Sequence, residues 1–295
     1  QDLAFGDNSV ASTGVNGTTG RHSMRLINTR FSAESKFFWD ERATSLETQT
    51  TMPIRDHGEM GFSGTNGDLS FNDLITKLSA INYYKELFKF VYGTEEITET
   101  KIQFALAQFI RSIQSFDSKY DAGRAAAPND GVNFNNFTAQ ENQGKNLFLT
   151  PPNFNATGVR IAGGLGCAGC HRAPEFDIDP NSRNNGIIGR ISGTGGIDVT
   201  NTRAPSLRDL VKIDGTPNGQ MMHTGGIVTL QNAIGHYGTI NLAPGNNNLD
   251  PRLMPGGFGQ QLNLTATEVN SVIAFLKTLT GTNVYTDTKW ANPFN

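Results

Sequence analysis

The chain has 295 residues, which is enough for one large domain or two domains of ordinary size. Hydrophobic residues make up 37% and charged residues 17%, as in a globular protein with a weakly charged surface. The net charge of −3 and the lack of basic runs argue against a nucleic-acid partner. No apolar run approaches the roughly 20 residues of a membrane span. The polar residues after Gln1 are not a signal peptide, so we expect any export signal to have been removed already.

The first half of the sequence predicts short helices between loops. Residues 1–35 and 55–67 are rich in Gly, Ser, Thr and Asn, which is typical of loops. The strongest helix pattern runs from Glu99 to Ser115, where apolar residues recur every three or four positions. Further helices are expected within 37–46 (after an aromatic cluster), from Asn72 onward, and over 82–91.

The second half contains two capping boxes, in which a Thr and a Glu three residues later cap the start of a helix. Thr138 and Glu141 begin a helix that runs through Phe148. Thr265 and Glu268 begin the last helix, which a glycine at 281 is placed to end. The other expectations are a linker over 121–136, a loop over 172–203, and short helices over 205–210 and 228–237.

Strand patterns are almost absent from the sequence. We therefore expect an all-α fold with long loops, in two halves joined near residue 130. Each half is expected to be a shell of helices around a bulky group. Long structureless loops are unusual in compact domains, and wrapping a large prosthetic group is one reason for them.

The chain has only two cysteines, which excludes a disulfide framework. They lie in the segment Cys167-Ala168-Gly169-Cys170-His171, which has the C-x-x-C-H form of covalent haem attachment. The two thiols would form thioethers with one porphyrin, and the adjacent His would reach its iron. A redox dithiol would need a βαβ setting, and a zinc site would need two further ligands, neither of which is visible. The sequence therefore predicts one c-type haem, and with it a location outside the cytoplasm.

The ligand on the other face of this haem stays open on the residues alone. Met side chains belong more often to a core than to a metal site, and His side chains in loops are more often exposed or hydrogen-bonded. Six candidates follow the motif in the sequence: Met221, Met222, His223, His236, Tyr237 and Met254.

A series of short motifs runs through nearly the whole chain. Those of the first half are Arg21-His22-Ser23, Asn28, the segment 38–43, Leu46, Gln49, Pro53 and Glu59-Met60. Those of the second half are the haem motif, the segment 204–208, His223-Thr224-Gly225, Leu230 and Leu279-Thr280-Gly281. In this order, the motifs resemble those of the bacterial di-haem cytochrome c peroxidases and their MauG-like relatives.

The resemblance implies two cytochrome c-like domains, here residues 1–130 and 131–295, each with one haem. Peroxide would react at the N-terminal haem, and electrons would enter through the C-terminal haem on Cys167, Cys170 and His171. The N-terminal C-x-x-C-H motif is absent from these 295 residues. We expect an upstream segment to supply it, because the residues that would surround that haem are retained.

Three departures from the family pattern qualify these expectations. Tyr237 stands where many of the peroxidases have an axial Met, which is the MauG-like arrangement. A phenolate ligand would stabilise ferric iron and make high-valent states easier to reach. Residues 13–17 lack the distal His of the classical peroxidases, so the peroxide-reacting haem would be open without reductive activation. His22 stands where an Asn usually binds calcium between the domains, which leaves calcium open.

The resemblance also gives roles to residues of the first half. Glu59 matches the carboxylate that moves a proton during peroxide cleavage. Gln49 is its polar neighbour, Pro53 lies on the same wall, and Trp39 lies between the two haems. On the residues alone, a solvated surface carboxylate is the favoured interpretation of Glu59. Trp39 can be a core residue as well.

Three more residues are candidates for contacts with the haem. Arg42 and Arg208 are candidate partners of its propionates, with surface ion pairs as the alternative. We expect His223 to make a structural or propionate contact.

The sequence thus favours a periplasmic oxidoreductase that reduces hydrogen peroxide with electrons passed through the C-terminal haem. A small cytochrome c or a cupredoxin is the expected donor, and a homodimer is expected from the family. One alternative is a MauG-like enzyme that oxidises a protein partner. The other is a non-catalytic carrier with a single haem.

Overall fold

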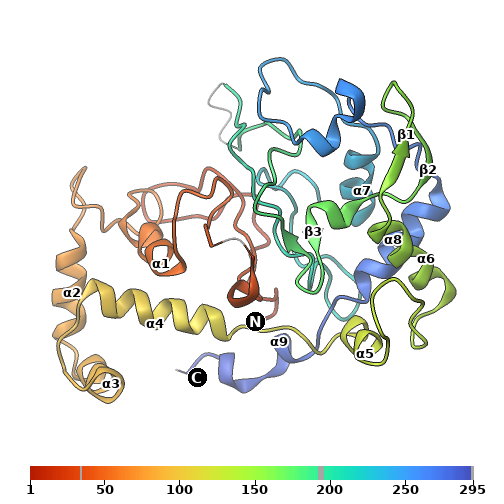
Figure 1. Cartoon of the computed structure of the whole chain (residues 1–295). Coiled ribbons are helices and arrows are strands. Elements are labelled where there is room, and N and C mark those ends of the chain that lie inside the picture. The colour runs from red at the N-terminus through yellow and green to blue at the C-terminus, as the bar shows by residue number, and fades with distance from the viewer. Residues whose placement is uncertain (34, 192–195, 294–295) are drawn as a thin grey trace.

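Helices dominate the structure, a computed structural model that describes residues 1–33, 35–191 and 196–293 (Figure 1). The helices are α1 (Leu46–Arg55), α2 (Phe71–Ser79), α3 (Asn82–Tyr92), α4 (Glu99–Ser112), α5 (Lys119–Ala125), α6 (Ala139–Leu149), α7 (Leu230–Gly238), α8 (Ala266–Lys277) and α9 (Asn283–Thr286). Two antiparallel pairs of short strands complete it: β1 (Pro152–Phe154) with β2 (Arg160–Gly163), and β3 (His171–Arg172) with β4 (Asp177–Ile178). No helix within these ranges is long and apolar enough to cross a membrane.

Local capping explains where several helices begin. The predicted boxes of Thr138 with Glu141 and of Thr265 with Glu268 are both formed, at the starts of α6 and α8. Thr229 caps α7 through its side chain, as its position before the apolar residues suggested. The helix expected from Asn72 instead begins at Phe71, because a box of Ser70 and Asp73 caps it.

Three expectations about local structure are wrong. Residues 121–125 of the expected linker belong to α5, which begins with a capping box of Ser118 and Asp121. Residues 205–210 are not helical, because tertiary contacts such as Leu207 N–H to the Phe176 carbonyl (3.0 Å) hold their backbone. Between 37 and 43 the chain forms an isolated β-bridge, and the helix begins only at Leu46.

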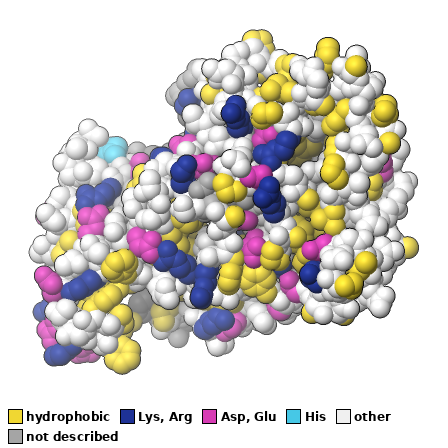
Figure 2. Space-filling model, viewed as in Figure 1, with side chains coloured by type: hydrophobic (Ala, Val, Ile, Leu, Met, Phe, Trp, Pro, Cys, Tyr) yellow, Lys and Arg dark blue, Asp and Glu magenta, His cyan; other side chains and the backbone are white. Residues whose placement is uncertain are grey.

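Helices α1 to α4 form a first group, on the left of Figure 1. Helix α1 packs on α4, and a small core of Ile54, Phe71, Phe88, Ile97 and Ile102 lies among the four helices. The surface of this group carries large apolar side chains beside charged ones (Figure 2). Phe90 of α3 is 89% exposed, and Phe104 of α4 is 51% exposed.

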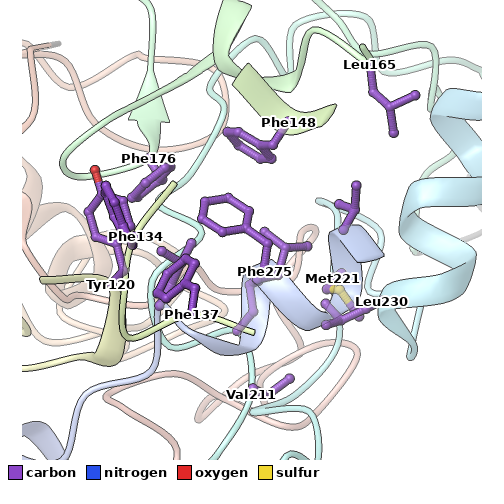
Figure 3. Packing of buried hydrophobic residues seen from close by; sticks show 14 of the residues in the cluster. Tyr120, Phe134, Phe137, Phe148, Leu165, Phe176, Val211, Met221, Leu230 and Phe275 are labelled. Carbon is purple, nitrogen blue, oxygen red and sulfur yellow. The ribbon is translucent and has the colours of Figure 1, made fainter. Parts of the chain in front are cut away.

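A second group is built on α6 and α8, which pack along each other. The helices approach so closely at Gly144 that a Cβ there would lie 1.8 Å from the Ser271 carbonyl oxygen, so only glycine fits. Beside them lies an aromatic core with Phe275 at its centre (Figure 3). The ring centroids of Phe148 and Phe176 lie 5.2 and 5.8 Å from that of Phe275. Tyr120 of α5 belongs to the same core, which places α5 with the second group.

Polar contacts join the two groups. The Arg21 guanidinium binds the carboxylates of both Asp40 and Asp198, at 2.7 Å each. Burial acts to raise the pKa of Asp198, but hydrogen bonds and the charge of Arg21 outweigh it and lower that pKa to about 2. The last helix, α9, returns toward the first group, where Val284 and Trp290 pack with Ile27 and Ile113.

Candidate haem site

A cavity of ≈ 760 Å³ lies in the second group beside α6, α7 and α8. This volume is in the range of about 300–1,000 Å³ that holds small molecules and cofactors. Its apolar lining includes Phe148, Leu165, Leu207, Leu210, Leu230, Leu262, Val272 and Leu276. Cys167, Cys170 and His171 line the same cavity, so the haem motif borders an apolar space of suitable size.

The backbone of the motif is fixed from both sides. Gly166 takes a positive φ of 70°, and Cys167–Gly169 then form a single turn of 3-10 helix. The Gly166 amide donates to the Thr150 carbonyl (3.0 Å), which ties this turn to the end of α6. On the other side, the Arg252 guanidinium donates to the Gly169 carbonyl. The turn thus presents both sulfurs to the cavity.

The environment of the two thiols does not suit the alternative chemistries. Both cysteines are free, and burial raises the pKa of each thiol, that of Cys167 to about 12. Redox dithiols instead have a lowered thiol pKa. Among the described residues there is no group of three or more His, Cys, Asp or Glu side chains that could hold a metal ion. Neither a redox dithiol nor a closed zinc site fits this geometry.

His171 is oriented by a hydrogen bond to its own loop. Its Nδ1 lies 3.2 Å from the Phe176 carbonyl oxygen, so we assign the proton to Nδ1. Burial lowers the pKa of the imidazole to about 4, which keeps the ring neutral. A neutral imidazole that donates through Nδ1 has a free lone pair on Nε2, the arrangement that iron ligation requires.

Of the six candidate ligands for the other face of the haem, four line the cavity and two do not. Met221, Met222, His223 and Tyr237 line the cavity. His236 and Met254 are not among the lining residues: the His236 ring bonds to the Asn185 carbonyl (2.9 Å), and Met254 packs on a smaller cluster.

Two of the candidate ligands that line the cavity, Tyr237 and Met222, contact the same side chain, Asn185. The Asn185 amide nitrogen lies 3.3 Å from the Tyr237 hydroxyl and 3.3 Å from the Met222 sulfur. Asn185 itself lies on the cavity wall. The structure therefore reduces the candidates for the second iron ligand from six to four, two of which share the Asn185 amide.

A partly buried arginine with one buried, unpaired nitrogen supplies a test of whether haem fits this cavity. Arg25 lines it, and its Nε is buried without a hydrogen-bond partner. Burial lowers the pKa of the guanidinium, and the charge of Asp209 acts against this shift. An arginine with an unused, buried donor suits an anionic group in the cavity, such as a haem propionate. Haem therefore fits both the size of the cavity and its charge.

Arg208, which the sequence suggested as a partner of a haem propionate, lies outside the cavity lining. Its side chain is fully buried, and its guanidinium forms a two-pronged ion pair with Asp121 at 2.8 and 2.9 Å. It also donates to the carbonyls of Pro174 and Ser115 (2.9 and 3.0 Å), and it is not among the residues that line the cavity. The structure therefore does not bring Arg208 to the predicted propionate contact.

Trp39 and His223 connect the cavity with the first group. Both line it, and their ring centroids lie 6.2 Å apart in an edge-to-face arrangement. The Trp39 indole donates to the His22 carbonyl (2.6 Å), and the His22 amide donates to the His223 carbonyl (2.7 Å). Asn201 and the Gly189 carbonyl hold the His223 ring by hydrogen bonds. These contacts are those of a structural residue.

Gln49 and Pro53 lie four residues apart on α1, which places them on one face of that helix. The segment with Glu59 folds back on the end of α1 through the Phe62 amide and the Ile54 carbonyl (3.1 Å). Glu59 is half-buried, and the loop over 13–17 lies directly on it: Val15 donates to the Glu59 carbonyl at 2.9 Å.

Burial and the charge of Asp56 raise the pKa of Glu59 against the opposing charge of Arg42. This influence places Arg42 near Glu59, where it also pairs with Asp40 (2.8 Å) and covers the Phe38 ring. Arg42 is not among the residues that line the cavity. The structure thus gathers Glu59, Arg42 and the 13–17 loop in the first group.

Comparison with known proteins agrees with these features. A family profile described as di-haem cytochrome c peroxidase matches residues 1–127. Cytochrome c551 peroxidase of Nitrosomonas europaea is 28% identical over 255 residues, which are 83% of this chain and 61% of that protein. The methylamine utilization protein MauG of Methylophilus methylotrophus is 28% identical over 256 residues, 84% of this chain and 64% of that protein.

The chain is similar to the di-haem cytochrome c peroxidases and MauG proteins. MauG of Methylorubrum extorquens matches as well, at 29% identity over 82% of this chain and 60% of that protein. The chain thus spans about three fifths of the length of these relatives. The resemblance read from the sequence motifs is confirmed.

A solved structure shares the fold. It is titled as a MauG-like protein associated with microbial copper homeostasis, and the superposition gives a TM-score of 0.71 at 23% identity. The match covers 100% of this chain and 85% of that one. At this identity the likeness shows the fold, a mainly helical one with few strands, and nothing about the reaction.

The sequence did not reveal three residues that shape the cavity. Arg25, Asn185 and Arg252 come from loops far apart in the chain, and no periodic pattern marks them. Only the excess of Gly and Asn over 172–203 hinted that this loop would border a bulky group. Their contribution depends on tertiary placement, which single-sequence patterns do not carry.

Proposed function

We propose that this chain carries a c-type haem on Cys167, Cys170 and His171 and works in a peroxide-dependent haem oxidoreductase. The observation that carries the proposal is that one cavity is lined by the haem motif, Tyr237 and Arg25 together with Trp39 from the first half of the chain. His171 would bind the iron, and Arg25 would hold a propionate. When bound, the haem would supply one-electron redox chemistry.

The first group would serve a second haem, in a domain of residues 1–130, with residues 131–295 as the domain of the attached haem. Support comes from the separate cores of the two helix groups, although Tyr120 packs with the second. A segment outside these 295 residues would bind the second haem. Trp39 would connect the two sites, because it reaches the cavity wall from the first group.

Glu59 would act as the proton carrier for peroxide. A carboxylate that takes a proton from one peroxide oxygen and returns it to the other works best when its pKa lies near the working pH. Burial, together with Asp56, raises the pKa of Glu59 in that direction. Gln49 and Pro53 on α1 would shape the same pocket, and Arg42 would limit how far the pKa rises.

A MauG-like role, oxidation of a protein partner, is the second candidate. The observation in its favour is Tyr237, a hard oxygen ligand by type, whose ring lines the cavity. Burial raises the pKa of Tyr237 to about 12, and the Asn185 amide, which donates to its hydroxyl, opposes this rise. A phenolate ligand would lower the haem potential relative to a thioether.

The remaining parts of the proposal follow from the cofactor. Attachment of haem c outside the cytoplasm favours the periplasm, with hydrogen peroxide as oxidant and a small cytochrome c or cupredoxin as donor. A homodimer, as in related peroxidases, is part of the proposal. We do not extend it to calcium, because the His22 ring contacts the Ser9 carbonyl (2.8 Å) and calcium prefers oxygen ligands.

The test begins with the full natural protein. Pyridine haemochrome assay with intact mass should give two haems, and a reduced donor should be oxidised when peroxide is added. Glu59→Gln should lower the peroxide rate by about 10²–10⁴-fold. The control Glu86→Gln, an exposed carboxylate on α3, should leave it unchanged. A single haem with no peroxide turnover would support the electron-carrier alternative instead.

A further inference from the structure

Two side chains that can bind haem iron face the same amide. The Asn185 Nδ2 lies 3.3 Å from the Tyr237 hydroxyl oxygen and 3.3 Å from the Met222 sulfur. An amide nitrogen carries two hydrogens, so it can donate to both atoms at once. The hydroxyl and the sulfur are therefore neighbours on one part of the cavity wall, although they come from separate segments of the chain.

Met222, which lines the cavity, has a strained backbone conformation. Its φ is 66°, in the left-handed region that residues other than glycine rarely adopt. The bridge between Met221 and Ile227 closes a turn around it, and the Gly225 amide donates to the Met222 carbonyl at 3.1 Å. This turn sets the direction in which the Met222 side chain leaves the backbone, and the side chain lines the cavity.

Tyr237 is held from the helical side. It lies near the end of α7, and the Gln260 side chain donates to its carbonyl at 2.7 Å. The carbonyl of Asn185 is in turn bound by the His236 ring (2.9 Å), which fixes the segment that carries the amide. A hydrogen bond from the residue next to Tyr237 thus helps to position Asn185.

We propose that Met222 is an alternative distal ligand of the attached haem and that Asn185 is the positioning residue that selects Tyr237 over it. The inference rests on the haem of the proposed function. The amide donates to the phenolic oxygen and stabilises it, while its second hydrogen holds the sulfur to one side. Loss of either the hydroxyl or the amide should release Met222 to bind the iron.

The two ligands have opposite effects on the iron. A phenolate stabilises ferric haem and lowers the reduction potential, whereas a methionine thioether raises it. Asn185 would therefore set the potential at which the attached haem accepts an electron from its donor. This consequence can be measured by spectroscopy and redox titration, independently of any activity.

The experiment compares three variants of the full natural protein after its haem content is verified. In Tyr237→Phe, the midpoint potential of one haem should rise, and the ferric spectrum should gain the near-infrared band of thioether ligation. In Tyr237→Phe with Met222→Leu, the band and the rise should both be lost. Tyr237→Phe with Met221→Leu is the matched control, since Met221 is buried in the core beside Met222, and it should keep both.

Asn185→Leu in the otherwise natural protein should produce part of the thioether signal although Tyr237 is present. A Tyr237→Phe spectrum that Met222→Leu leaves unchanged would overturn Met222 as a ligand. A natural-like spectrum in Asn185→Leu would overturn the selecting role of Asn185. A natural protein without attached haem would instead defeat the proposed function, and the haemochrome assay identifies that case before any variant is compared.

Discussion

The two groups of helices use apolar side chains in opposite ways. Around α6 and α8, aromatic rings enclose Phe275, whose side chain is fully buried, and the packing stops at the wall of a cavity. On α3 and α4, Phe90 and Phe104 are instead exposed to solvent. The contrast shows that helical spacing of apolar residues does not tell whether that helix face is buried. Among the described residues, one such face is covered and another is exposed.

The largest effect should come from the aromatic core. Phe275→Ala removes a ring that contacts several others, and we expect it to lower the free energy of unfolding by about 3–5 kcal/mol. Phe104→Ala, on a side chain that is 51% exposed, should change it by only about 0.5 kcal/mol. Guanidinium titration of the full natural protein measures both. Equal losses would show that residues beyond those described cover α4, and the comparison between the groups would fail.

A smaller effect should follow from crowding the α6–α8 contact. Gly144→Ala would place a methyl group on the Ser271 carbonyl, which we expect to cost about 1–3 kcal/mol of stability. Gly235→Ala in α7 is the control, since a Cβ there meets nothing within 4 Å. That change should stabilise the protein by about 0.5–1 kcal/mol. A harmless Gly144→Ala would show that the two helices can separate without loss.

The charge that faces the cavity gives a third test. Arg25→Gln should lower the midpoint potential of the attached haem, because a nearby positive charge favours the reduced iron over the more positive oxidised form. Arg30→Gln, at an exposed position, should leave the potential unchanged. Redox titration followed by absorbance measures both variants. An unchanged potential in Arg25→Gln would argue against a propionate contact.

The smallest effect concerns the contact between the groups in acid. The pKa of Asp198 is lowered to about 2 from an ordinary value near 3.9, so its ion pair with Arg21 stabilises the fold fully above about pH 4. This contribution is lost as the pH falls from about 4 to about 2. The stability difference between natural protein and Asp198→Asn should therefore shrink over that window. A difference that stays constant to pH 2 would contradict the assignment.

Capping and spacing account for what the sequence could predict. The boxes at Thr138 and Thr265 fixed the starts of α6 and α8, because they depend on residues three apart. The haem motif is equally local. The end of α4 at Ser112, the loop over 205–210 and the displacement of Arg208 from the cavity depend on contacts between distant segments. No pattern in the sequence states which carboxylate a given arginine will meet.

The close approach of α6 and α8 has a consequence for how the cavity can change shape. One side of the cavity is supported by α6 and α8, whose backbones are in contact at Gly144. This contact leaves the two helices no room to move closer together. The other side is formed by turns, including the one that carries Met222. We therefore expect a rearrangement that admits or exchanges a ligand to move the turns and to leave the wall at α6 and α8 in place.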